Sequence, residues 1–505
     1  MTSKEKSEVL GGSRITKMRE RTKTIRRLGS IAAVNLGAKF LNVLALVILA
    51  RLLSPRDFGL VAIAAIVTGL LSLFQDLGLS AALVQLEQDS TIARNICFWG
   101  NLASRSLLYA IAFWVAEPMA IFFSEPEVAM IIRVSAIALL IQAIGSTHAA
   151  ILHRELRFAD VAKVDAANIL VGTTATIVLA LVGLSYWSLV FGALISEPVG
   201  VALLWRLVRW RPTFEVKKDI SKRMLSFGKH VGIINTLYFG LRNLDDLVVG
   251  KLLGALALGY YGISMRLGMF TAANVGVVVS HVMFPTYARM QEKPERMRVA
   301  FRDTLRGVTT IVAPITIISA VLARPLVFVL LGASWNPAVE PLRILALYGL
   351  AYSIVAVSAN IFLAKGRPDL STLTGSVQLI ILICSILPLL GLAGIMGVAI
   401  AATLALVVGA SLSLYLVAKL LEVTWKFYRD LFAPITMASL PGIALGLLLP
   451  MVVVDPISQL AIGSILIIAT YALCLQRLTK GELGRDLAIV WHSLLQTKQS
   501  AESIQ

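Results

Sequence analysis

The chain has 505 residues, of which 57% are apolar and only 15% are charged. Soluble domains contain about half apolar and about a quarter charged residues, so this composition excludes an ordinary soluble enzyme and indicates a membrane protein. The formal net charge of +17 does not indicate nucleic-acid binding. Cytoplasmic loops of membrane proteins carry excess lysine and arginine, and no basic patch falls on a soluble domain.

Long apolar runs follow one another along almost the whole chain. Residues 1–28 are polar and basic, and the run 29–52 that follows is too long for a signal-peptide core, so we expect a first membrane helix. The pattern predicts an all-α polytopic membrane protein with about 14 transmembrane helices. The expected spans are 29–52, 58–77, 93–115, 127–152, 161–183, 186–206, 230–252, 258–286, 307–330, 343–364, 369–391, 395–418, 430–449 and 457–476.

Lysine and arginine fall almost entirely in every second gap between these runs. Cations crowd residues 1–28, the gap 207–229 and the gap 287–306, whereas the gaps after spans three, five, eleven and thirteen hold none. Positive loops lie on the cytoplasmic side, so the pattern predicts cytoplasmic N- and C-termini.

A faint internal repeat divides the chain. Segments 50–64 and 250–264 occupy the same place in the span order, and they match at a constant shift of 200 residues. Six spans separate them, which predicts two parallel six-helix lobes around a central cavity. The expected domains are an N-lobe (29–206), a cytoplasmic linker (207–229), a C-lobe (230–420), two extra helices (421–476) and a cytoplasmic tail with an amphipathic helix (477–505). The identical pairs are Leu52/Leu252, Leu53/Leu253, Gly59/Gly259 and Ile63/Ile263.

Two cations inside apolar runs lack an acidic partner within a helical turn. Lys39 shares a helix face with Asn35 and Asn42, and Arg105 follows Asn101 by one turn. Charged side chains within a bilayer normally face a protein interior or an aqueous cavity. We therefore expect these residues to line a cavity that binds an anion.

Two further cations allow more than one interpretation. Arg242 faces the same cavity or is neutralised by Asp245 and Asp246 in its own helix. Arg266 either lines the cavity or extends its side chain to the membrane surface. Both stay candidates for substrate binding.

Acidic residues within or beside the spans are candidates for ion coupling. Asp76 ends the second span, and Glu197 precedes Pro198 in the sixth. Together with Asp245 and Asp246 they either carry an ion or proton or form structural salt bridges.

Motifs of soluble catalysis are missing from the sequence. There is no Walker A loop, no GxSxG and no HExxH motif, and the three cysteines and five histidines are scattered. We therefore expect no enzymatic activity, no cofactor and no metal site.

Several segments resemble Wzx-type polysaccharide exporters. They are LARLLSPRDFGLVAIAAIVTGLLSLFQDLGLSAALVQ (49–85), ILHRELRFADVAKVDAANILVG (151–172), YWSLVFG, LGALALGYYGISMRL (253–267) and VMFPTYARMQ (282–291). The chain is most similar to the colanic-acid-exporter-like branch of the multidrug/oligosaccharidyl-lipid/polysaccharide (MOP) superfamily.

This resemblance implies a flippase of the bacterial inner membrane. Its substrate would be an undecaprenyl-diphosphate-linked oligosaccharide for surface polysaccharide synthesis, and its partners would be membrane lipids, a polysaccharide polymerase and export machinery. By its spacing before the ARLL segment, Lys39 resembles the first-helix cation of related lipid II flippases. A cation-coupled multidrug exporter and a membrane glycan polymerase or ligase are the alternatives.

Overall fold

The structure is a computed structural model that describes residues 41, 44–76, 78–85, 91–215 and 217–479. Every regular element within these ranges is a helix, as the sequence predicts. The helices are α2 (Pro55–Ser72), α3 (Leu79–Gln85), α4 (Thr91–Phe123), α5 (Glu127–Ser135), α6 (Ile137–Arg154), α7 (Phe158–Leu181), α8 (Tyr186–Leu207), α9 (Lys218–Ala288), α10 (Pro294–Val321), α11 (Ala323–Leu330), the 3₁₀ helix η1 (Ala333–Ala338), α12 (Val339–Ala364), α13 (Pro368–Leu421), α14 (Trp425–Val452) and α15 (Pro456–Leu478).

Eleven helices in the described part of the chain are long and apolar enough to cross a membrane. The 71-residue α9 is interrupted at Gly254 (φ 82°), and the 54-residue α13 is interrupted at Ala393 and Gly394. The sequence predicts two spans for each of these long helices. Most of its first span, 29–52, lies outside the described residues, so the total of about 14 stays a prediction.

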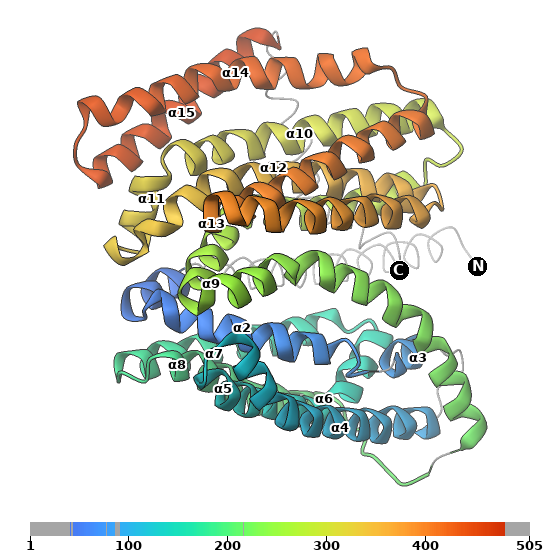
Figure 1. The fold of residues 1–505 in the computed structure, drawn as a ribbon. Coiled ribbons are helices and arrows are strands. Elements are labelled where there is room, and N and C mark those ends of the chain that lie inside the picture. Colours follow the sequence, from blue (N-terminus) through green and yellow to red (C-terminus); the bar gives the residue numbers. More distant parts are fainter. Residues whose placement is uncertain (1–40, 42–43, 77, 86–90, 216, 480–505) are drawn as a thin grey trace, which may run out of the picture.

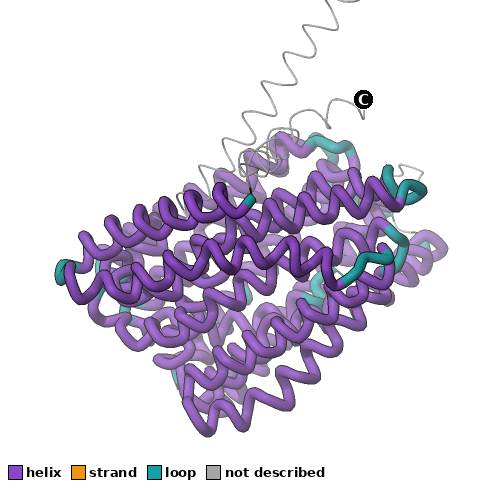
Figure 2. Tube along the Cα trace, turned by 90° about the horizontal axis from the view of Figure 1, so that it is seen from above, coloured by secondary structure: helices purple, strands orange, loops and turns teal. Residues whose placement is uncertain are grey.

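The helices form two groups on either side of α9. Figure 1 shows α2–α8, the N-terminal group, below α9, and α10–α13, the C-terminal group, above it, with α14 and α15 at the far edge. Helix α9 packs against both groups, because it contacts α2 on one side and α12 on the other. Seen from above, helices fill the view and loops lie at their ends (Figure 2).

The distribution of buried and exposed side chains is that of a protein surrounded by lipid. Large apolar side chains cover the outside, among them Trp114 (78% exposed) and Leu392 (82%). Polar and charged side chains such as Asn101 and Arg105 lie inside. An interior position is where a bilayer protein can satisfy polar groups, so this distribution supports the membrane assignment.

Helix α2 begins where Ser54 and Asp57 form a capping box. The Asp57 carboxylate accepts a hydrogen bond from the Ser54 amide (2.8 Å), and the Ser54 hydroxyl oxygen accepts one from the Asp57 amide (3.2 Å). Asp57 also accepts from the Tyr186 amide (3.2 Å) at the start of α8. One carboxylate therefore stabilises the N-termini of two helices, where negative charge is favoured.

The two repeated segments meet each other in a reciprocal contact. A Cβ atom on Gly59 would lie 1.7 Å from the Ala255 carbonyl oxygen, and one on Gly259 would lie 1.8 Å from that of Pro55. Residues 55 and 255, like 59 and 259, are separated by the 200-residue shift of the repeat. Pro55 opens α2, and Ala255 opens the part of α9 after its break. Exchange of partners in this way is the contact that a local two-fold axis produces.

Candidate functional site

A cavity of about 570 Å³ lies between α2, α7, α8, the second part of α9 and the helical residues 44–52. Its size falls within the range of about 300–1,000 Å³ that is usual for small-molecule sites. The cavity is lined by Ala45, Leu46, Leu49, Phe58, Asn168, Ile169, Gly172, Thr173, Thr176, Leu189, Ala193, Arg266 and Phe270.

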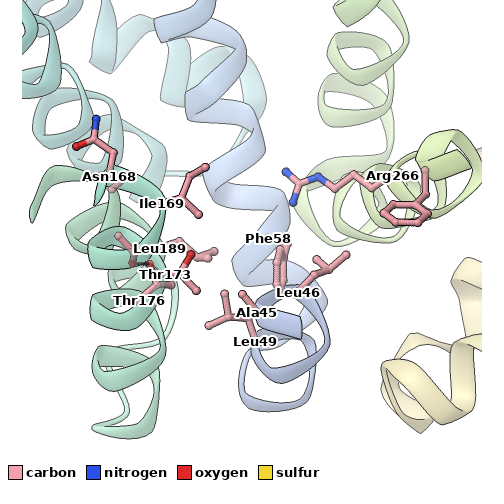
Figure 3. Close-up of a pocket in the computed structure, with 13 residues that line it drawn as sticks. Ala45, Leu46, Leu49, Phe58, Asn168, Ile169, Thr173, Thr176, Leu189 and Arg266 are labelled. Carbon is pink, nitrogen blue, oxygen red and sulfur yellow. Dashed lines mark hydrogen bonds between the residues drawn. The ribbon is translucent and has the colours of Figure 1, made fainter. Parts of the chain in front are cut away.

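Arg266 is the one charged side chain among these lining residues. Figure 3 shows it extending from α9 toward α2, which carries Phe58, and the helical residues 44–52, which carry Leu46, with Asn168 and Thr173 on the opposite side. The Arg266 side chain is exposed, and the negative charge of Asp246 attracts it. The cavity thus combines a guanidinium, hydroxyl and amide groups, and an apolar wall.

Asn168 contributes an unsatisfied acceptor beside this cavity. Its Oδ1 atom is buried without a hydrogen-bond partner. Helix α8 carries Gly200 opposite the amide, where a Cβ atom would lie 2.5 Å from that same oxygen. The carboxamide therefore faces Gly200 on α8, and in Figure 3 it points away from Arg266.

Arg105 occupies a different place, inside the N-terminal group of helices. It is 7% exposed, and its Nη1 donates to Gln142 Oε1 (3.2 Å) on α6. Gln142 Nε2 in turn donates to Glu197 Oε1 (2.8 Å) on α8. One glutamine side chain therefore connects the guanidinium of α4 to a carboxylate of α8.

A second carboxylate, that of Asp76, lies near the same arginine. Asp76 accepts from the Ser80 hydroxyl (2.6 Å) and from the Ser80 amide (3.1 Å to Oδ1). Asn101, fully buried, donates to Ser80 Oγ (3.4 Å) and Ser146 Oγ (3.2 Å). Asp76 and Glu197 both attract Arg105, yet the ion pairs within the described ranges include none between Arg105 and either acid.

The acids of α9 have partners other than Arg242. Asp245 is buried and accepts a hydrogen bond of 2.5 Å from the hydroxyl of Tyr261, which is fully buried. Arg242 is exposed, and no ion pair of the described residues joins it to Asp245 or Asp246. Both roles predicted for Arg242 therefore stay predictions.

Two cations of the repeated segments bind helix ends at one end of the molecule. Arg51 donates to the carbonyl oxygens of Val329 and Leu330 at the end of α11. Lys251 donates to the Phe122 carbonyl at the end of α4, and its Nζ lies 4.7 Å from the centre of the Phe122 ring. Residues 51 and 251 are again 200 apart, so each repeat supplies a cation to a helix C-terminus of the other group.

Two further hydrogen bonds strengthen the same end. Trp335 Nε1 donates to the Ala50 carbonyl (2.7 Å), and the Ala255 amide donates to Glu125 Oε1 (3.2 Å). The charge pattern of the loops predicts that this end faces the exterior.

The candidate residues from the sequence are thus distributed over three places. Lys39, Asn35 and Asn42 lie outside the described residues. Arg266 lines the cavity, while Arg105 and Asn101 lie in the polar network with Asp76 and Glu197. The third place, on α9, holds Arg242, Asp245 and Asp246.

Sequence reasoning did not select Gln142, Asn168 or Tyr261. Gln142 and Asn168 are carboxamides within apolar runs, and this signal could have identified them. Tyr261 carries no such signal, because a tyrosine in a membrane helix is ordinarily an apolar packing residue.

A family model described as "Polysaccharide biosynthesis protein" matches residues 48–340 of the chain. The chain belongs to this family. It is 24% identical over 408 residues to the lipopolysaccharide biosynthesis protein WzxC of Escherichia coli, a match that covers 80% of this chain and 82% of WzxC. It is 30% identical over 314 residues to the succinoglycan biosynthesis transport protein ExoT of Rhizobium meliloti, covering 62% of each. The resemblance to Wzx-type exporters of the MOP superfamily is thereby confirmed.

Solved structures agree on the fold. The lipid II flippase MurJ in its inward closed conformation superposes with a TM-score of 0.74 at 14% identity, covering 89% of this chain and 98% of MurJ. An inward-facing multidrug MATE transporter of the MOP superfamily gives 0.55 at 16% identity, covering 78% of this chain and 99% of its own. The family member described here therefore has the helical fold that MurJ and MATE transporters share.

Proposed function

We propose that this protein transfers a lipid-linked oligosaccharide across the bacterial inner membrane for the synthesis of a surface polysaccharide. The observation that carries the proposal is the cavity with Arg266 on one side and Asn168, Thr173 and Thr176 on the other. The family assignment and the relatives named for polysaccharide synthesis and transport support the same function.

The chemistry of the cavity fits a lipid diphosphate that carries sugars. A guanidinium recognises phosphate oxygens through paired N–H donors. The polar lining residues Thr173 and Thr176 suit the hydroxyl groups of a sugar, with the Thr176 oxygen as an acceptor because its hydroxyl donates to the Gly172 carbonyl. Leu46, Leu49 and Phe58 provide an apolar surface. We expect Lys39, with Asn35 and Asn42, to add a second cation to this surface, and Arg105 and Arg242 stay candidates for later contacts.

Transport would proceed by alternating access of the two groups of helices. The contacts of Arg51 and Lys251, together with the Gly59–Gly259 approach, join the groups at the end predicted to be external. When the cavity opens to the exterior, these contacts would break and others would form at the cytoplasmic end. Because the arrangement is reciprocal, we expect the two groups to rock apart symmetrically at this end.

In this proposal the protein is a transporter rather than an enzyme. Both termini lie in the cytoplasm, in agreement with the cations of residues 1–28 and the charge pattern of the loops. The translocated oligosaccharide would pass to a polysaccharide polymerase and export machinery outside the inner membrane.

Reconstitution tests the proposal. Purified protein in liposomes receives a fluorescent lipid-diphosphate oligosaccharide in both leaflets, and the fraction reachable by an external quencher is followed with time. We expect protein-dependent exchange between leaflets that R266A abolishes. If the rate of exchange equalled that of protein-free liposomes, the proposal would be refuted. A cooperative thermal unfolding transition is the control that the protein is folded.

A further inference from the structure

The segment that joins α8 to α9 is bound to the N-terminal group of helices. Helix α8 ends at Leu207 and α9 begins at Lys218, and residues 208–215 between them form neither helix nor strand. We call residues 208–215 the strap. Figure 1 shows it beside α4, at the edge of the N-terminal group. A segment without regular structure needs partners for its backbone polar groups, and side chains of α4 supply them.

Two side chains of α4, one helical turn apart, bind the same residue of the strap. Asn95 is fully buried, and its Nδ2 donates to the Thr213 hydroxyl (2.6 Å) and to the Glu215 carbonyl (3.3 Å). Its Oδ1 accepts from the Thr213 amide (3.0 Å), and Trp99 Nε1 donates to the Thr213 carbonyl (2.9 Å). The Trp99 ring also stacks on Phe214, with 4.7 Å between the ring centres. Both backbone polar groups of Thr213 are therefore satisfied by α4.

Apolar and aromatic contacts hold the first half of the strap. Val208 is 4% exposed and packs in an apolar cluster to which α6 contributes. The centre of the Trp210 ring lies 5.4 Å from that of His148 on α6 and 6.2 Å from that of Phe98 on α4. The strap therefore contacts both α4 and α6 along its length.

The first turns of α9 continue this attachment. Met224 is 1% exposed and belongs to the same apolar cluster as Val208, together with Leu83 of α3 and Cys97 of α4. The sequence predicts a cytoplasmic linker over residues 207–229, and a flexible linker of that length would let the two groups of helices move independently. Instead, the strap and the start of α9 are both packed on the N-terminal group.

We infer that the strap is a fixed part of the N-terminal group, clamped to α4 by Asn95, and that it stays docked when the two groups of helices move against each other. Its release would leave the buried amide of Asn95 and the backbone of Thr213 without partners, and it would expose Val208 to water. The inference concerns the cytoplasmic linker and goes beyond the proposed function, on which only the movement between the groups rests.

Distances between spin labels test whether the strap stays docked. The full-length protein in nanodiscs, with its three cysteines replaced, carries labels at T91C and R209C, two exposed positions on α4 and on the strap. We expect one narrow distance distribution, unchanged by the lipid-diphosphate oligosaccharide of the reconstitution assay. A second pair, T91C and K426C, joins α4 to the exposed start of α14 and reports movement between the groups.

Two asparagines of the same helix provide a matched pair of variants. N95A removes the clamp and should broaden the distribution between positions 91 and 209. N101A is the control, because Asn101 is equally buried on α4 but donates to Ser80 (3.4 Å) and Ser146 (3.2 Å) instead of the strap. It should leave the distribution narrow. Size exclusion checks that both variants are folded.

A disulfide tests the same inference during transport. In the cysteine-free protein, N95C and T213C replace the hydrogen-bonded pair, and oxidation joins the strap to α4 covalently. We expect the oxidised protein to exchange substrate between leaflets at the rate of the cysteine-free parent. A bis-maleimide bridge between R51C and L330C, which joins the two groups of helices, should stop exchange and serves as the control for trapped movement.

Three outcomes would overturn the inference. A second distance between positions 91 and 209 on addition of substrate would show that the strap leaves α4. A distribution as narrow in N95A as in the parent would show that Asn95 is not the clamp. Loss of exchange on oxidation of N95C/T213C, restored by a reductant, would show that transport needs the strap to detach. The N95A result requires no transport, so the strap and the proposed function can fail separately.

Discussion

Arg105 and Arg266 are the same residue type in the same kind of sequence, an apolar run expected to cross the membrane, yet their surroundings differ. Arg105 is 7% exposed and is hydrogen-bonded to Gln142 between two acids. Arg266 is exposed and extends into a cavity of about 570 Å³. A cation inside an apolar run thus indicates polar surroundings, but the helix face decides whether it joins a buried network or lines a cavity.

The largest expected effect comes from removing the buried cation. R105Q removes the charged donor of the hydrogen bond to Gln142, which is worth about 1.5–3 kcal/mol, and also the cation that attracts Asp76 and Glu197, so we expect a loss of stability above this range. We expect a strongly lowered unfolding temperature in detergent and less protein in the membrane. R133Q is the matched control, because the exposed pair of Arg133 and Glu117 contributes only about 0–1 kcal/mol. If R105Q and R133Q had the same unfolding temperature, Arg105 would not be a structural cation, and it would not differ from Arg266 in this respect.

Removing the cavity cation should have the opposite signature. R266A should leave the unfolding temperature nearly unchanged while export of polysaccharide is lost. A hydrogen bond to a charged group is worth about 1.5–3 kcal/mol, so we expect substrate affinity to fall roughly ten- to a hundredfold. R266K should restore part of the activity, since it keeps the charge without the paired donors. The measurement is surface polysaccharide per amount of membrane protein. If R266A exported polysaccharide fully, Arg266 would not belong to the substrate site.

Tyr261 is a neutral partner of a buried acid, so its removal tests how neutral and charged partners compare. Y261F removes the donor to the buried Asp245, and this should cost about 1.5–3 kcal/mol, less than the loss of Arg105. Thermal unfolding measures the change, with Y352F as the control because Tyr352 is 37% exposed. A loss as large as that of R105Q would mean that neutral and charged partners are equivalent here.

The smallest effect is expected where a charge faces solvent. Asp455 accepts from the Ser458 amide (2.8 Å) at the start of α15, and this hydrogen bond holds the pKa of that carboxyl below its ordinary value. A lowered pKa means that the stabilisation is present at neutral pH and is lost as the pH falls through the folded-state pKa. D455N should therefore lower the unfolding temperature slightly at neutral pH and not in acid. An equal shift at both pH values would assign the effect to packing.

The sequence predicted the class of fold well, whereas the roles of its candidate site residues stay predictions. Apolar runs and loop cations were enough for an all-helical membrane protein, because each signal is local. Selecting Arg105 and Arg266 was equally local. Their surroundings were not: Arg105 reaches Gln142 across 37 residues, and Gln142 reaches Glu197 across 55. Contacts between three helices depend on how each helix is rotated, which a one-dimensional pattern does not contain.

The internal repeat shows the same limit of prediction from the sequence. Gly59 and Gly259 are a matched pair in the sequence, but glycine is common here, with 36 residues in the chain. The exchange of Pro55 and Ala255 as their neighbours emerges only in three dimensions.

The reciprocal glycine contact also limits how sequences of this kind can diverge. A larger residue at position 59 would need room at position 255, and one at 259 would need room at 55. The two halves cannot accumulate substitutions independently at these four positions, even where neither half touches a substrate. Across related chains we therefore expect positions 59 and 259 to stay small together, or to enlarge only with a compensating change in the opposite half.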